Sequence, residues 1–327
     1  MGWKGAIRSI QAAQRRSERE ARRRQNELEG RRKQLAKMQE LERAAFEVEE
    51  YENRIDLLTS VHKECGEVWN WESIYEKPAP SEPTPGNTHE QAARRRLDTF
   101  KPSVTDKLLK RTQSRIDNLA ADLEKAQTLD RTEFEASLAA YRQEYQDWED
   151  TRNLAGRILG RDIEAFTDAI REVDPFSEIS ALGSRIHFVI DHVSAVNVTF
   201  DVHGADIIPS EVKSLLQSGK LSVKKMPKGR FYEVYQDYVC GCVLRIAREL
   251  FALLPIETTI VTAIGEVLNT QTGHIEQKPI LSVLVPKATL AKLDFERLDP
   301  SDSLNNFVHR MKFKKTGGFE PVETISS

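Results

Sequence analysis

Residues 231–285 read FYEVYQDYVCGCVLRIARELFALLPIETTIVTAIGEVLNTQTGHIEQKPILSVLV. Up to Leu254, apolar residues recur every three or four positions and cover much of the circumference of a helix, which is typical of a helix buried against a sheet. Pro255 ends this helix. Beyond it, two β-branched runs flank the turn sequence NTQTG, so residues 256–268 and 275–285 are predicted to form a β-hairpin.

Two shorter segments upstream also alternate between apolar and polar side chains. They span residues 186–191 and 196–203 and are separated by a turn around Ser194, so they predict another hairpin with one buried face. Near the C-terminus, Asp299 is placed to cap one of several short helices. The resulting order is ββαββα, which predicts an α+β domain at residues 176–327 with helices packed on an antiparallel or mixed sheet.

The N-terminal half of the chain is rich in residues that favour helices. Residues 7–62 contain one glycine and no proline, and residues 104–152 contain neither. Each segment has an apolar stripe in steps of three and four, and from Phe134 to Trp148 these steps follow a heptad seam. A helix of about 55 residues is roughly 80 Å long and needs a partner to cover such a stripe.

A proline-rich segment separates the two long helices and favours an extended conformation. The sequence therefore predicts a long antiparallel coiled-coil helical hairpin, and pairing of each stripe with its counterpart in a second chain is the alternative. An aromatic cluster that includes Trp69 and Trp71 is expected to close the hairpin. Before the α+β domain, the predicted parts are a first long coiled-coil helix with its aromatic plug (1–76), a Pro-rich linker (77–90), and a second long helix with a short third helix (91–175).

Charge is unevenly distributed along the 327 residues, although the formal net charge is only −3. Residues 1–40 contain 12 Lys/Arg and 5 Asp/Glu, whereas residues 41–76 contain 3 and 10. The basic residues 1–17 fit a membrane-surface anchor, an organellar presequence or simply the first turns of the helix. With three cysteines and no apolar run of about 18 residues, a disulfide scaffold and a transmembrane helix are not expected, and we expect a cytoplasmic protein.

One candidate for chemistry is a metal-dependent nuclease site. Glu276 and Lys278 match the acid-x-lysine half of a restriction-endonuclease-like motif, and Glu257 or Glu266 is the candidate second carboxylate. Such a site would use the carboxylates to hold Mg²⁺ and the lysine to steady the attacking water. The three-residue pattern is also common by chance, so the sequence leaves open whether the protein is an enzyme.

A second candidate is an anion-binding surface. Aromatic side chains among lysines can stack on bases while the amines contact phosphates, and solvated loops produce the same composition. The residues that form this predicted surface are Lys220, Lys224, Lys225, Lys228, Arg230, Arg310, Lys312, Lys314 and Lys315.

Two further sets of possible metal ligands are better explained by ordinary structural roles. His187, Asp191, Asp201 and His203 share faces of the first predicted hairpin but lack the spacing of a known metal site, so they are expected to be polar side chains on a solvated face. The two cysteines of the segment CGC at 240–242 lack further ligands and are expected to pack as small buried hydrophobes.

The sequence favours an assembly or adaptor protein. The long helices would form a homo-oligomer or bind a partner protein, and the α+β domain would bind a partner or an anionic ligand such as nucleic acid, without a cofactor. The alternative is the metal-dependent nuclease, which would require Mg²⁺.

Overall fold

The computed structural model describes residues 31, 40–103, 109–181, 185–202, 207–269 and 271–326. These residues fall into two compact units. The helical unit contains Ser73–Asn153, and the sheet unit contains the described residues up to Glu72 and from Leu154 onward. The predicted basic segment 1–17, the predicted start of the first helix at residue 7, and His203 lie outside the described residues.

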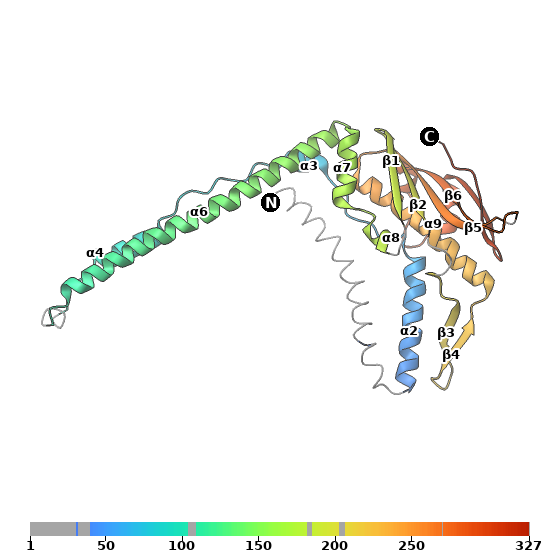
Figure 1. Ribbon diagram of the computed structural model, residues 1–327, viewed down its shortest axis with the longest axis horizontal. Coiled ribbons are helices and arrows are strands. Elements are labelled where there is room, and N and C mark those ends of the chain that lie inside the picture. Colours follow the sequence, from blue (N-terminus) through green and yellow to red (C-terminus); the bar gives the residue numbers. More distant parts are fainter. Residues whose placement is uncertain are drawn as a thin grey trace. The chain divides into compact units, whose positions relative to one another are not determined.

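In the described residues a group of helices precedes the first strand, and helices and strands are mixed after it; Figure 1 labels most of these elements. The helices are α2 (Glu40–Thr59), α3 (Trp71–Tyr75), α4 (Thr88–Asp98), α6 (Thr112–Leu159), α7 (Ile163–Val173), α8 (Ser177–Ala181), α9 (Lys228–Leu253), α10 (Lys287–Leu290), α11 (Pro300–Ser303) and the 3₁₀ turn η3 (Leu304–Asn306). The strands are β1 (Ile186–His192), β2 (Ala195–Asp201), β3 (Glu211–Leu215), β4 (Leu221–Lys225), β5 (Thr258–Leu268), β6 (Ile275–Pro286), β7 (Val308–Lys314) and β8 (Gly318–Glu320).

The C-terminal sheet is mixed, which is one of the two arrangements the sequence predicts. Its order is β1-β2-β5-β6-β7-β8. β2 runs parallel to β5, and the other neighbours are antiparallel. β3 and β4 form a separate two-stranded sheet. The long helix α6 and this sheet confirm a chain of mixed helix and strand.

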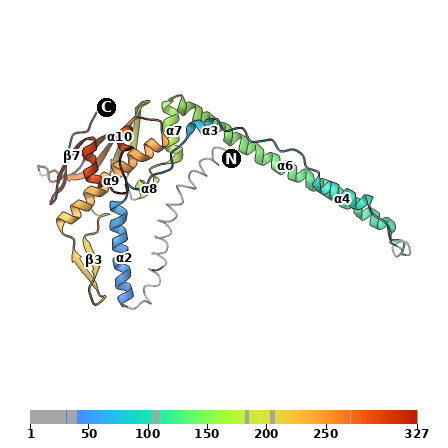
Figure 2. The same cartoon turned by 180° about the vertical axis from the view of Figure 1, so that it is seen from behind.

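The predicted buried helix is α9, which crosses one face of the sheet (Figure 2). From Val234 to Leu253 it buries almost every residue, including Tyr238 and Ile246. The side chains of β2 that face it, such as Val198 and Phe200, are also buried. The predicted hairpin that follows is β5–β6, whose strands pair from Thr258 with Pro286 to their tips.

The observed order contains two strand pairs that are missing from the predicted ββαββα order. β3–β4 precedes α9, and β7–β8 occupies the region where only short helices were predicted. In β7 the alternating side chains are exposed and half-buried, and lysine and arginine fill most of the exposed positions. Basic and apolar residues do alternate from Arg310 to Lys314, but this run is only five residues long, and its cluster of basic side chains also predicts an anion-binding surface.

Part of the apolar stripe of α2 is buried within the sheet unit, where the sequence predicts a coiled coil with the second long helix, although Leu41 is 51% exposed. α2 packs against α9, β3 and β4, with Phe46 and Val48 among its buried side chains. Lys213 Nζ on β3 lies 3.0 Å from Glu47 Oε2 on α2. A stripe of this kind specifies only that an apolar surface covers it, and a groove between a helix and a β-ribbon satisfies that requirement as well as another helix does.

The predicted aromatic plug is attached to the C-terminal end of α9. The rings of Trp69 and Trp71 stack with their centroids 5.0 Å apart. The backbone N–H of Trp69 donates to the carbonyl of Ala252, and Nε1 of Trp71 donates to the carbonyl of Leu253 at 2.6 Å. The cluster therefore closes the end of α9.

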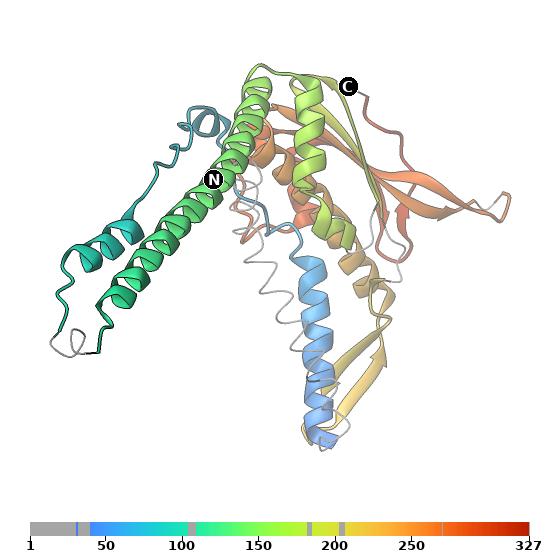
Figure 3. The same ribbon diagram turned by 60° about the vertical axis from the view of Figure 1, so that its left-hand side comes forward.

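In the helical unit, the short helix α4 lies beside α6, and the Pro-rich segment before it runs extended along α6 (Figure 3). Trp148 Nε1 donates to the carbonyl of Lys77 at 2.8 Å. The guanidinium of Arg152 lies 4.6 Å from the ring centroid of Tyr75. The start of the extended segment is thereby fixed to α6.

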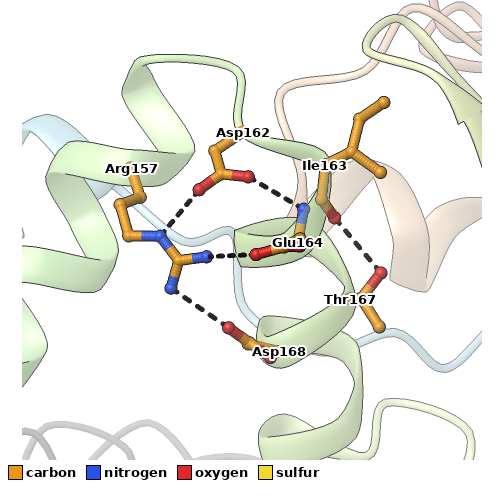
Figure 4. A network of polar contacts seen from close by, with 6 residues as sticks. All are labelled: Arg157, Asp162, Ile163, Glu164, Thr167 and Asp168. Carbon is orange, nitrogen blue, oxygen red and sulfur yellow. Dashed lines mark hydrogen bonds and ion pairs between the residues drawn. The ribbon is translucent and has the colours of Figure 1, made fainter.

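The turn between α6 and α7 is organised by one arginine (Figure 4). Arg157 Nε lies 2.7 Å from Asp162 Oδ2, and Nη1 lies 3.2 Å from Asp168 Oδ2. Asp162 also caps α7 by accepting from the backbone N–H of Glu164. The hydrogen bond from Arg157 lowers the pKa of Asp162, so the carboxylate that caps α7 stays charged to a lower pH.

Candidate functional site

The structure does not bring the predicted nuclease residues together. Glu276 and Lys278 form an ion pair at 3.1 Å on β6. Glu266 is level with Gln277, which places it on the opposite face of the hairpin. Glu257 precedes β5, nine positions before Glu266, which corresponds to about 30 Å along a strand. Three carboxylates in these positions cannot hold one Mg²⁺ ion between them.

The predicted anion-binding residues fall into two groups. Lys220, Lys224, Lys225 and Lys228 lie in or beside the β3–β4 ribbon and at the start of α9, and all four are exposed. Among the described residues, no ion pair engages these four lysines. Lys220 lies beside the β3–β4 turn, whereas Lys224, Lys225 and Lys228 lie at the other end of the ribbon, which we call the basic ribbon end.

The other group lies mainly on β7, and acids of the C-terminal segment neutralise part of it. Arg310 Nη1 lies 2.8 Å from Glu323 Oε2, and Lys314 forms an ion pair with Glu320. At the start of α9, Arg230 pairs with Glu233 at 2.9 Å. These three cations are therefore less available to an anion than the sequence suggests.

The sheet unit also has a pocket of about 760 Å³ between the start of α9, α11 and β7. Sequence reasoning missed it, because its acids come from segments that are about 60 residues apart. Asp237, Asp299 and Asp302 line it together with Lys315. Burial, aided by the negative charge of Asp299, raises the pKa of Asp237 to about 6.

One group of potential metal ligands occurs among the described side chains. His89, Asp130 and Glu133 have ligand atoms within 4.8 Å of one another. Both carboxylate oxygens of Asp130 already accept backbone hydrogen bonds from the first turn of α4, at 3.1 Å from His89 N and 2.7 Å from Glu90 N. The arrangement is explained by capping of α4.

The histidine and aspartate set of the first hairpin does not form such a group in the described part of the chain. His187 pairs with Thr199, and Asp191 and Asp201 lie toward opposite ends of the hairpin. Cys240 and Cys242 are buried in α9, and burial raises the pKa of Cys242 to about 12. A thiol with so high a pKa is a poor nucleophile and a poor metal ligand at neutral pH.

α6 carries a partly uncovered apolar stripe, which we call the α6 stripe. Its first half is aliphatic and its second half is largely aromatic. Tyr145 contacts both aromatic neighbours, with ring centroids 5.9 Å from Tyr141 and 5.3 Å from Trp148. The residues of the α6 stripe are Ile116, Leu119, Leu123, Ala126, Phe134, Leu138, Tyr141, Tyr145 and Trp148.

α4 covers one flank of the α6 stripe. Leu119, Ala126 and Leu129 line a pocket of about 380 Å³ that α4 closes from the other side. With 3.6 residues per turn, Ile116 and Tyr145 lie on the other flank. Each is 37% exposed. The α6 stripe therefore has an apolar flank that the described helical unit leaves in contact with water.

Charge is divided along the helical unit. Residues 89–103 and 109–119, around the connection between α4 and α6, contain seven Lys/Arg and three Asp/Glu. Residues 73–88 and 133–153 contain three Lys/Arg and eight Asp/Glu. One end of the unit is basic and the other is acidic, which gives an approaching partner an electrostatic direction.

Comparisons with protein-family models, with curated proteins and with solved structures give no match for this chain. None of the helices that the structure describes has the length and apolar character needed to cross a membrane.

Proposed function

We propose that this chain is an assembly or adaptor protein that docks onto another chain through the open flank of the α6 stripe. The observation that carries the proposal is the exposure of Ile116 and Tyr145 on a stripe that α4 covers from one side only. A 48-residue helix with such a flank lowers its free energy when another apolar surface removes the flank from water.

Docking through the α6 stripe would then hold the sheet unit in place for its own binding role. Its basic ribbon end, with Lys224, Lys225 and Lys228, supports binding of an anionic ligand such as nucleic acid, and Lys220 adds a further exposed cation beside the β3–β4 turn. Binding of this kind weakens as salt increases, because bound counterions are released from the polyanion. The nuclease alternative receives no support, because its carboxylates do not converge.

Site-specific photo-cross-linking tests the docking role in cells that make the protein. A photoreactive amino acid replaces Ile116 or Tyr145 on the open flank, and Ala121 or Thr132 on the opposite face of α6 serves as the matched control. We expect protein cross-links from the two flank positions and few from the controls. Equal cross-linking from both faces, or none from either, would rule the docking role out.

Anion binding has its own test. We expect fluorescently labelled single-stranded RNA or DNA to bind the full chain more weakly as salt rises, and replacement of Lys224 and Lys225 by glutamine to weaken it further. Replacement of Arg310 and Lys314, which already pair with acids, is the control and should have a smaller effect. An equal loss in both variants would contradict the assignment to the ribbon end.

A further inference from the structure

We infer that the partner of the α6 stripe is α6 of a second copy of this chain, running antiparallel and centred near Thr132. This inference rests on the proposed function, because it names the occupant of the same open flank. It is argued from the spacing of the α6 stripe, the sizes of its side chains and the division of charge along the helical unit.

The spacing of the α6 stripe suits an antiparallel pair. When two copies of α6 run antiparallel about Thr132, eight of the nine stripe residues lie level with another stripe residue. The exception is Phe134, which lies level with Asp130, the residue that caps α4.

Side-chain size favours the same orientation. In the antiparallel register Ile116 lies level with Trp148, Leu123 with Tyr141, and Ala126 with Leu138. Each pair joins a smaller aliphatic residue to a larger one, so the volume is even along the interface. A parallel pair would stack the aromatic halves on each other and leave the aliphatic halves underfilled, which is costly at a close-packed contact.

Charge distinguishes the two orientations most clearly. In the antiparallel arrangement, the basic end around 89–119 lies beside the acidic end around 133–153 of the second copy. In a parallel arrangement the two basic ends meet and the two acidic ends meet. Opposite charges on two surfaces steer their association, and like charges oppose it. At moderate salt these interactions are screened beyond a Debye length of about 10 Å. The division of charge therefore selects the antiparallel pair.

Sedimentation of the purified full chain is the first test. We expect the weight-average mass to rise from monomer to dimer with concentration. Combined replacement of Ile116 and Tyr145 by glutamine should raise the dissociation constant by about tenfold or more. Replacement of the exposed Ala121 by glutamine on the opposite face is the matched control and should leave the constant unchanged.

Cysteine cross-linking then fixes the orientation. Two proteins are prepared in a Cys65→Ser background that keeps the buried Cys240 and Cys242, one with Leu123→Cys and one with Tyr141→Cys, and one of them carries ¹⁵N so that mass distinguishes the products. Treatment with a short bismaleimide should join the two different proteins to each other. Products that join only identical proteins would show parallel pairing and overturn the inference.

The outcomes separate this inference from the proposed function. A protein that stays monomeric at every concentration overturns pairing with a second copy. If photo-cross-links from Ile116 nevertheless reach a different protein in cells, the docking role stands and only the identity of the partner changes. If those cross-links are also absent, both conclusions fall.

Discussion

Asp130, in the middle of α6, accepts a hydrogen bond at 2.7 Å from the backbone N–H of Glu90 in the first turn of α4. Its other carboxylate oxygen accepts from the N–H of His89 at 3.1 Å. The first N–H groups of a helix have no partner within the helix, and here a neighbouring helix supplies one. The position of α4 on α6 therefore depends on one buried carboxylate.

Replacement of Asp130 by alanine should destabilise α4 by about 0.5–2 kcal/mol, the usual range for loss of an N-terminal cap. Amide hydrogen exchange of the first turn of α4 would report the effect directly. The control is Glu124→Ala, because Glu124 is an exposed acid of α6 that does not line the pocket between α6 and α4. If both variants accelerate exchange equally, the capping role is wrong.

Gly318 and Gly273 form a matched pair for a second prediction. Both have positive φ, +77° and +72°, so either alanine variant is strained by about 1–2 kcal/mol. A Cβ at Gly318 would also lie 2.8 Å from Cε1 of Tyr232, whereas a Cβ at Gly273 would meet nothing within 4 Å. Gly318→Ala should therefore lower the free energy of unfolding more than Gly273→Ala in urea titrations. Equal losses would show that Tyr232 moves aside freely.

The burial of His62 is expected to make the folded protein less stable in acid. It is 2% exposed, and neither ring nitrogen has a hydrogen-bond partner within the part of the chain that the structure describes. Burial lowers its pKa, the charges of Lys63 and Arg248 lower it further, and Asp299 and Glu296 partly oppose the shift. Because the unfolded chain binds the proton more readily, this residue should destabilise the fold as pH falls through about 6.5. His62→Leu should remove that part of the pH dependence, and an unchanged profile from pH 8 to 5.5 would contradict it.

Asp237 is expected to make the stability of the folded protein depend on pH in the opposite direction. Its pKa is about 6 in the folded protein, well above the usual value near 3.8. The folded state therefore binds the proton more readily, and this group destabilises the fold increasingly as pH rises from about 4 to 6. Asp237→Asn should be more stable than the natural protein at pH 7.5, by an amount that solvent in the open pocket keeps modest, and the difference should vanish near pH 4. A constant difference would show that the carboxyl charge is not responsible.

The elements with strong apolar patterns could be predicted from the sequence alone. α9 and the β5–β6 hairpin were predicted within a few residues, because a long apolar helix and two β-branched runs around a turn have few alternative structures. β7 was missed because its alternation of apolar and polar residues covers only the five positions from Arg310 to Lys314 and coincides with a cluster of basic side chains. The burial of α2 in the sheet unit was missed because a stripe does not specify the kind of surface that covers it.

The candidate sites depended on information that a sequence pattern lacks. Glu276 and Lys278 were correctly expected to be neighbours, since a strand places alternate residues on one face. The position of Glu266 on the other face follows from its pairing with Gln277, which only the strand register shows. The acidic pocket of Asp237 and Asp299 has no local signal, because the two residues come from different elements.

The attachment of Gly66 and Trp71 to the end of α9 has a consequence for the topology of the chain. Gly66 donates to the carboxylate of Glu249, 183 positions later, so the sheet unit is made of two stretches of sequence with the helical unit inserted between them. A protease cut in the exposed prolines near Pro80 would then leave two fragments joined by the tryptophan pair and α2. Such fragments should co-purify, and each made separately should require the other in order to fold.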